Sequence, residues 1–368
     1  MKPKLLCILH CSPPNHGAAK VGDFIAESKK LSEHFECQFI AIKSSNSISD
    51  IGRVNLKKIY FSIELFFKVL WALLCFRPDK IYFTASIKGV AFYRDLVISL
   101  LWKTYSLFKR TKIYYHYHTK GVDSWISQSG SNLKLTQFFL KNVNLILLSK
   151  LLEKDFIKMK TYSKVYYLSN GVEDLLSRNK FEIIALEKYR EVKTIEVLYL
   201  AHMMEDKGYW DVLKLAKKTK GQNIRYHFAG SWQNAKNKHE FLEFVKINDL
   251  GGQVTYHGFV SGSDKVSLFE RAHFLLYPSK NDAFPLTILE SLSYGVPVIS
   301  TNEGAIADIL DEKSGIIIFD VDKLYGVFKE AQNKLLNVET AKCCRQRYLD
   351  NFTLDCFEDN LVQILGDK

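Results

Sequence analysis

Cysteine, proline and glycine are all scarce in this sequence. Its 368 residues include 7 Cys, 7 Pro and 19 Gly. So little proline and glycine excludes a fibrous or low-complexity chain. The cysteines are odd in number and form no CxxC pair, which argues against a disulfide scaffold or a zinc ribbon and favours a reducing cytoplasm.

Long hydrophobic runs are missing as well. The opening MKPKLLCILHCSPP has an apolar run of about six residues, too short for a secretion signal. The two most apolar segments, 59–76 and 90–108, are interrupted by charged side chains, so neither is expected to span a membrane. Two interpretations of these segments stay open: core-facing helices of an α/β domain, or a face that dips into the bilayer surface.

Positive charge is plentiful and unevenly distributed. The net charge is +11, but residues 1–180 hold 28 Lys and Arg against 13 Asp and Glu, whereas residues 181–368 hold 23 against 27. A basic half suits nucleic acid, an anionic membrane surface or an acidic ligand. Because no helix-turn-helix, zinc finger or RNP motif accompanies the charge, we do not expect nucleic acid as a partner.

Short apolar runs alternate with helix-length segments along the whole chain, which predicts parallel, doubly wound sheets. A polar stretch at 170–182 interrupts the rhythm and is expected to be a linker. We therefore predict two α/β domains, 1–175 and 176–368, with the last helices, about 338–366, packing back on the first domain. The strands are expected at 5–10, 37–42, 80–85, 112–118, 145–149, 165–169, 195–201, 224–230, 253–258, 273–278, 296–300 and 315–319.

The segment YPSKNDAFPLTILESLSYGVPVIS, residues 277–300, carries the most specific signal. Pro285 suits the first position of a helix, where no N–H is needed. Asp282 lies just before that helix, and Glu290 lies inside it. The helix start predicts an anion site suited to a diphosphate. The backbone N–H groups expected to form that site belong to Phe284, Leu286 and Thr287.

DAFPLTILE followed by ESLSYGVPVIS resembles the acidic-x7-Glu signature of the family-4 retaining glycosyltransferases. These enzymes have the GT-B fold, in which two Rossmann-like domains face a cleft. The resemblance implies that Asp282 contacts the donor sugar, that the amides of Ala283 and Phe284 hold sugar and diphosphate, and that Glu290 binds the ribose. Asp282 and Ala283 are departures, because the family usually has Glu and Gly there.

Two further segments resemble the same family. In LYLAHMMEDKGYWDVLKLAKK, Lys207 matches the lysine that neutralises the donor diphosphate, while His202 stands where the family has Arg. In CSPPNHGAAKVGDF, Gly17 matches the glycine whose backbone approaches the donor phosphate and sugar. Nearby Lys20 is either a further phosphate contact or an ordinary surface lysine.

The segment KIYYHYHTKG places His116 and His118 on one face of a strand. We favour His118, at the strand end, as the histidine that contacts the donor sugar in many family-4 enzymes. Phe259 matches the loop beneath the nucleotide base. Asp320-Val321-Asp322 has the DxD pattern of a metal motif, but Asp322 is expected to cap a helix instead, so we expect no metal and no other cofactor.

The resemblance implies a retaining, metal-independent glycosyltransferase of cell-surface polysaccharide synthesis. It would move a sugar from a nucleoside-diphosphate sugar to a glycan or polyprenyl-diphosphate-linked acceptor at the inner face of the cell membrane. The expected catalytic residues are His118, Lys207 and Asp282. Two alternatives stay open: a nucleotide-sugar epimerase of the same fold, and a non-catalytic scaffold subunit that binds nucleotide sugars.

Overall fold

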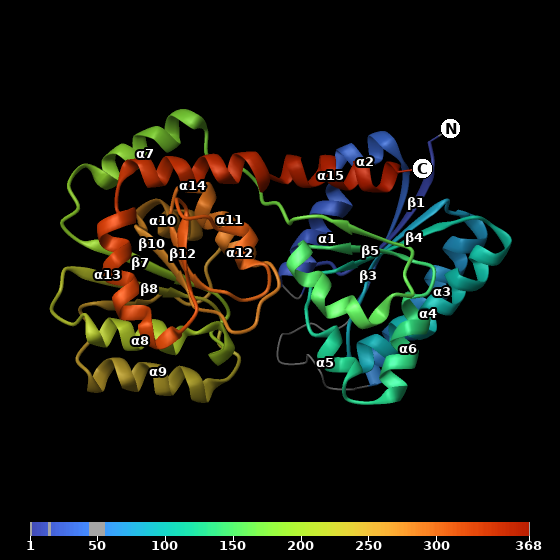
Figure 1. Ribbon diagram of the computed structural model, residues 1–368, viewed down its shortest axis with the longest axis horizontal. Coiled ribbons are helices and arrows are strands. Elements are labelled where there is room, and N and C mark those ends of the chain that lie inside the picture. Colours follow the sequence, from blue (N-terminus) through green and yellow to red (C-terminus); the bar gives the residue numbers. More distant parts are fainter. Residues whose placement is uncertain (1, 14–15, 44–55, 368) are drawn as a thin grey trace. The chain divides into compact units, whose positions relative to one another are not determined.

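The computed structural model describes residues 2–13, 16–43 and 56–367. It divides the chain into two compact units, residues 1–170 with 354–368, and residues 171–353. Each unit holds one six-stranded sheet at its centre with helices around it (Figure 1). All the strand pairs are parallel, as the alternating pattern predicts.

The first sheet has the strand order β2-β1-β3-β4-β5-β6. The four inner strands, β1, β3, β4 and β5, are buried and rich in Ile, Leu, Phe and Tyr because helices cover them, whereas the edge strands β2 and β6 are partly exposed. Their bounds are β1 Lys4–Leu9, β2 Glu36–Ala41, β3 Lys80–Thr84, β4 Lys112–Tyr117, β5 Asn144–Leu147 and β6 Lys164–Tyr167. The helices of this unit are α1 Gly17–Glu27, α2 Lys29–His34, α3 Leu56–Cys75, α4 Gly89–Phe108, α5 Val122–Ile126, α6 Gly130–Leu140, the 3-10 segment Lys150–Met159 and α15 Leu354–Gly366.

The second sheet has the order β12-β11-β10-β7-β8-β9, which is the dinucleotide-fold order when it is followed from β9. Its strands are β7 Ile195–Leu200, β8 Ile224–Ala229, β9 Val254–Tyr256, β10 Phe274–Tyr277, β11 Val298–Thr301 and β12 Gly315–Ile318. The helices are α7 Arg178–Arg190, α8 Tyr209–Lys218, α9 Ala235–Ile247, α10 Gly262–Arg271, α11 Leu286–Ser293, α12 Ile306–Ile309, α13 Leu324–Leu335 and α14 Val338–Asn351, with 3-10 turns at Glu205–Lys207 and Val321–Lys323.

Every segment expected to be a strand overlaps one of these twelve strands, but some local predictions are wrong. Of the last helices, expected to pack back on the first domain, α14 packs in the second unit against α11 and α7. The expected linker 170–182 contains the start of α7, because Ser177 accepts a hydrogen bond from the N–H of Lys180 and so caps a helix there. Asp320, not Asp322, is the capping residue. Its side chain accepts a hydrogen bond from the N–H of Asp322 and so caps the 3-10 turn that precedes α13.

The chain's last helix, α15, packs within the first unit against α2. Lys30 of α2 lies 2.6 Å from carboxylate oxygens of both Asp355 and Asp359. Beyond α15, Asp367 binds Lys164 and Tyr166 at the edge strand β6. These two partners lower the pKa of Asp367 to about 2, so the carboxylate stays charged.

A buried arginine ties α14 to the rest of the second unit. Arg345 donates two hydrogen bonds to Asp174, of 2.9 and 2.7 Å, and two more to the carbonyls of Leu176 and Ser293. The carbonyl of Ser293 belongs to the last turn of α11. This cation therefore holds α14 against the helix that carries the acidic signature.

Candidate functional site

The carboxyl ends of β7 and β10 lie side by side in the second sheet. After β7 the chain continues toward the β9 edge of the sheet, and after β10 it continues toward the β12 edge. In open α/β sheets such a switch point is where ligands bind. Lys207 follows β7 and Asp282 follows β10, so two residues that are 75 positions apart in the sequence reach the same place.

Backbone contacts hold these two loops together. Gly208 has φ +81°, and a Cβ there would lie 2.2 Å from the carbonyl oxygen of Pro278, so only glycine fits. The N–H of Lys280 donates to the carbonyl of Asp206 at 2.7 Å, and the Asn281 side chain donates to the Asp206 carboxylate at 3.0 Å. The positions of Lys207 and Asp282 are thereby fixed by the backbone.

Lys207 and Asp282 form an ion pair, with Nζ and Oδ2 2.7 Å apart and side chains 18% and 17% exposed. Lys207 also donates to the carbonyl of Asn281 at 2.6 Å. The hydroxyl of Tyr277 donates to the same Asp282 oxygen at 2.7 Å, while burial and Asp282 raise the pKa of Tyr277. Tyr277 therefore remains a protonated donor that orients Asp282, a role that the sequence analysis missed.

A third loop, which follows β11, completes the frame around Asp282. Gly304 has φ +57°, and a Cβ there would lie 2.2 Å from the carbonyl oxygen of Asp282. The N–H of Ala305 donates to the carbonyl of Ala283 at 2.8 Å. Ala283 and Phe284 are buried, and the Phe284 ring lies 6.1 Å from that of Phe352. The carbonyls of residues 282 and 283 are thus turned into the protein.

Helix α11 starts at Leu286, one residue later than predicted, because Pro285 adopts an extended conformation and is the N-cap. Leu286 and Thr287 lie in the first turn, whose N–H groups have no acceptor within the helix and attract anions. Gly295, with φ +66°, follows the end of the helix. The N–H groups of Gly295 and Val296 donate to the carbonyls of Leu292 and Ser291, which closes the helix.

Glu290 lies one turn inside α11 and forms an ion pair with Lys265 of α10, with side chains 24% and 30% exposed. Lys265 was not among the predicted site residues; its only signal in the sequence is its place six residues after Phe259. The Phe259 ring is exposed to solvent. A ligand hydroxyl that binds Glu290 has to share the carboxylate with Lys265.

His202 is half-buried in the loop after β7 that also carries Lys207. Its carbonyl accepts from the N–H of Met204 at 2.7 Å, and the N–H of Met203 donates to the carbonyl of Ser231. Gly230 with φ +148° lets the next loop pass directly over the carbonyl of Ala201. His202 is therefore held in place by the loop after β8.

In the first unit, histidines gather where β1 and β4 end. The rings of His116 and His118 have centroids 4.0 Å apart, and those of His10 and His16 6.2 Å apart. Burial lowers the pKa of His118 to about 3, and burial with the nearby Arg94 lowers the pKa of His10 to about 3. Both rings are neutral at pH 7, so each offers one donor and one acceptor.

Arg94 and Asp95 form a buried ion pair beside these histidines, 2.7 Å apart, and Asp95 also accepts from the N–H of Ser86. In the sequence, both stand out only as charges that interrupt the apolar segment 90–108. Gly17 begins α1, where the His16 ring caps the helix by accepting from the N–H of Ala19. A Cβ at Gly17 would meet no described atom within 4 Å, so packing within the chain does not require glycine there.

The predicted residues thus fall into two groups, one in each unit. Gly17, His118 and the further candidates Lys20 and His116 belong to the first unit, and the other predicted site residues belong to the second. Lys20 lies with its Nζ 4.5 Å from the Phe24 ring of its own helix. Pro14 and Asn15 of the amino-terminal motif lie outside the described residues. Across the residues that the structure describes, no cluster of three His, Cys, Asp or Glu side chains suits a metal ion.

Comparison with known proteins matches residues 182–345 to the family model "Glycosyl transferases group 1". The chain is 25% identical over 178 residues to a 2-deoxystreptamine N-acetyl-D-glucosaminyltransferase of Niallia circulans. It is 27% identical over 184 residues to the capsular polysaccharide biosynthesis glycosyltransferase CapM of Staphylococcus aureus. Each alignment covers 47% of this chain and 45% of the relative's own length.

Solved structures share the whole fold. The HepE protein of Anabaena in complex with UDP superposes with a TM-score of 0.72 at 14% identity, covering 99% of both chains. The glycosyltransferase of Rickettsia africae gives 0.72 at 15% identity, covering 99% of this chain and 97% of that one. These likenesses confirm the GT-B fold, with its two units of parallel sheet.

The assignment of Glu290 to the ribose can be tested by nucleotide binding alone, without measuring turnover. Glu290→Ala should lower the affinity for a nucleoside diphosphate by roughly ten- to a hundredfold, because hydrogen bonds to a charged group are worth about 1.5–3 kcal/mol. Binding is measured by calorimetry or by the rise in melting temperature that a bound ligand produces.

Lys265→Met is the matched control, since it removes the ion pair but leaves the carboxylate. Its affinity should stay within about threefold of wild type or improve, because Glu290 no longer has to be shared. Equal losses in both variants would show that the pair only supports α11 and that Glu290 binds no ribose.

Proposed function

Because residues 182–345 are a glycosyl transferases group 1 domain, we propose that the chain transfers a sugar from a nucleoside-diphosphate sugar to an acceptor hydroxyl. The observation that carries the proposal is the Lys207–Asp282 pair at the β7/β10 switch point, directly before the start of α11. A cation and a helix N-terminus together suit a diphosphate. The carboxylate beside them suits the sugar hydroxyls of the same donor.

The reaction that we propose breaks the bond between the anomeric carbon and the diphosphate oxygen, and forms one from that carbon to the acceptor oxygen. The acceptor proton passes to an oxygen of the leaving diphosphate, on the face that the sugar has just left. Lys207 and the first-turn amides of α11 stabilise the negative charge that develops there. Asp282, oriented by Tyr277, accepts a hydrogen bond from a donor hydroxyl, and the configuration is retained.

The proposal names the acceptor only by its chemical class. We assign the acceptor to the first unit, whose positive charge suits a diphosphate and whose neutral His118 ring offers one donor and one acceptor to sugar hydroxyls. A glycan or polyprenyl-diphosphate-linked saccharide, used in cell-surface polysaccharide synthesis, fits that charge. The similarity to CapM supports this class of pathway. We propose that the chain acts on such an acceptor at the cytoplasmic face of a membrane.

Substitutions distinguish the role of Lys207 from that of Asp282. Lys207→Met should lower turnover by about a hundredfold or more, since it removes the charge that stabilises the leaving group. Asp282→Asn keeps an acceptor oxygen and should retain more activity than Asp282→Ala. The neighbouring Lys280, which is exposed and paired with Asp211, provides the control Lys280→Met.

Lys280→Met should remain within about threefold of wild type. Release of nucleoside diphosphate from the donor, measured with and without acceptor, gives the rates. A Lys207→Met variant with the turnover of Lys280→Met would overturn the assignment of the leaving-group site. Donor consumption that yields an epimerised nucleotide sugar without any acceptor would identify an epimerase instead.

Retention is read from the product. An α-linked donor should give an α-linked product, because the proposed reaction has no base opposite the leaving group. Proton NMR of the anomeric signal measures the configuration directly. A β-linked product would contradict both the mechanism and the resemblance to retaining enzymes.

Metal independence is tested by chelation. We expect turnover to survive EDTA, because Lys207 and α11 supply the positive charge that a divalent cation supplies in metal-dependent transferases. Loss of activity with EDTA, with recovery on addition of magnesium or manganese, would contradict this and direct attention to Asp320 and Asp322.

A further inference from the structure

Two helices of the first unit expose large apolar side chains. We call the surface made by these residues the α3–α4 face. On α3 they are Leu56, Ile59, Tyr60, Ile63, Phe67, Trp71 and Leu74. On α4 they are Val90, Tyr93, Val97, Leu100, Leu107 and Phe108.

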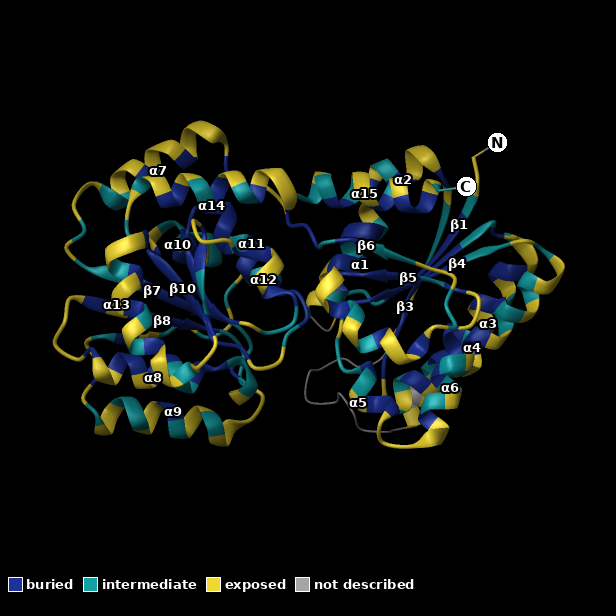
Figure 2. Ribbon diagram, viewed as in Figure 1, coloured by how far each residue is buried: buried dark blue, intermediate teal, exposed yellow. Residues whose placement is uncertain are grey.

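These side chains form one stripe on each helix. At 100° per residue, the exposed positions of α3 fall within an arc of about 120° and those of α4 within about 100°. The opposite side of each helix packs into the core through residues such as Val69, Ala72, Ile98 and Trp102. The two helices pack against each other, and exposed positions recur along both of them in Figure 2.

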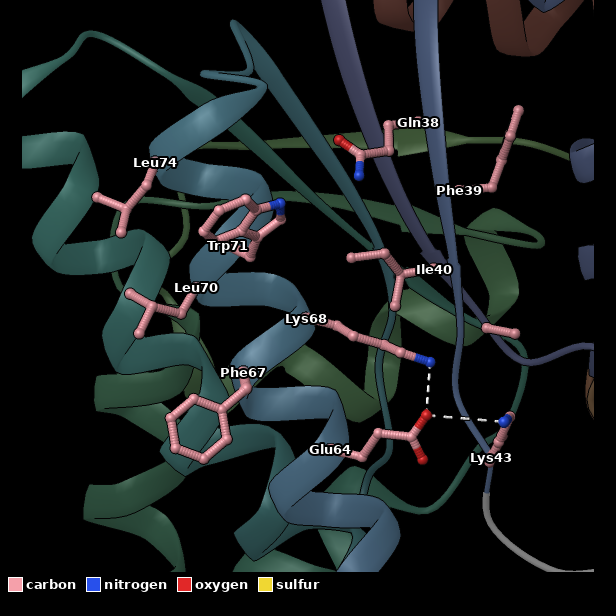
Figure 3. Close-up of a pocket in the computed structure, with 11 residues that line it drawn as sticks. Gln38, Phe39, Ile40, Lys43, Glu64, Phe67, Lys68, Leu70, Trp71 and Leu74 are labelled. Atoms are coloured by element: carbon pink, nitrogen blue, oxygen red, sulfur yellow. Dashed lines mark hydrogen bonds and ion pairs between the residues drawn. The ribbon is translucent and has the colours of Figure 1, made fainter.

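A groove of about 700 Å³ extends this face between α3 and the edge strand β2. Phe67, Trp71 and Leu74 lie along it, and Lys43, Glu64 and Lys68 form a charged cluster at one end (Figure 3). Glu64 lies 2.5 Å from Lys68 and 3.7 Å from Lys43. The groove is therefore mainly apolar, with two cations and one carboxylate at one end.

The segment that carries the α3–α4 face has a large excess of positive charge. Residues 56–112 contain eleven Lys and Arg but three Asp and Glu. Of the three acids, Asp95 is buried with Arg94, and Glu64 and Asp79 are ion-paired with lysines. A second copy of the chain would bring two such basic surfaces together, whereas an anionic surface complements them.

We propose that the α3–α4 face is a membrane-docking surface that lies in the headgroup region of an anionic bilayer. Its apolar stripes enter the boundary of the acyl chains, and the groove beside β2 takes a single lipid chain, while the surrounding lysines bind lipid phosphates. Exposed Tyr, Trp and Phe suit this depth, where one end of the ring is apolar and the other is wet. No helix among the described residues is long and apolar enough to cross a membrane.

The proposal rests on the proposed function only for its biological setting, a lipid-linked acceptor. The test uses the full chain and phosphatidylcholine vesicles with or without phosphatidylglycerol. Wild type should bind the anionic vesicles more tightly, and salt should weaken the difference. Replacing two exposed rings, Phe67→Gln with Trp71→Gln, should reduce binding by about tenfold or more.

The control replaces two equally exposed apolar residues of the second unit, Ile247→Gln with Phe319→Gln, and should bind like wild type. Trp71 also reports its own depth, because it is 68% exposed, while Trp102 and Trp125 are buried and the other two tryptophans lie in the second unit. Lipids with a nitroxide on the acyl chain should quench wild-type fluorescence. Trp71→Phe should still bind vesicles but lose most of that quenching.

Binding by the Phe67/Trp71 double variant at the wild-type level would overturn the proposal, as would unchanged quenching in Trp71→Phe. Self-association that depends on these residues, without vesicle binding, would assign the face to a second copy instead. Nucleoside-diphosphate binding is measured on every variant. A chain that binds vesicles but no nucleotide would contradict the proposed function and leave the docking surface standing.

Discussion

The contact on which the rest of the site depends is the 2.7 Å ion pair between Lys207 and Asp282. Its members come from loops on either side of a switch point, and the backbone brings those loops within van der Waals distance. Two glycines make this possible, because Gly208 and Gly304 lie where a Cβ would overlap the carbonyls of Pro278 and Asp282. The pair thereby occupies a preformed position, which lowers the cost of reorganisation when a ligand binds.

The pair also keeps the site neutral overall before a donor arrives. Lys207 is bound by Asp282 and by the carbonyl of Asn281, and Glu290 is bound by Lys265. In the proposed complex the donor diphosphate binds Lys207 in competition with Asp282, and the ribose shares the Glu290 carboxylate with Lys265. Since both pairs are partly exposed, exchanging them for ligand contacts costs little.

The sequence predicted the fold well because periodicity depends on local residues. All twelve strand segments carry short apolar runs, and the helix expected at Pro285 is present as α11. What it missed depends on contacts across the chain. Tyr277 looks like a core tyrosine, and Lys265 like a surface lysine, until the fold brings them to Asp282 and Glu290. The apolar sequences of α3 and α4 fitted both a core-facing helix and a face at the bilayer surface, and only the packing shows which of their residues are exposed.

A crystal structure of the chain with a nucleoside diphosphate tests the central claim most directly, since that claim concerns where the nucleotide binds. We predict that the diphosphate lies on Lys207 and the amides of Leu286 and Thr287, with the ribose hydroxyls on Glu290. A nucleotide bound elsewhere, with Lys207 still paired to Asp282 and Glu290 to Lys265, would contradict the account.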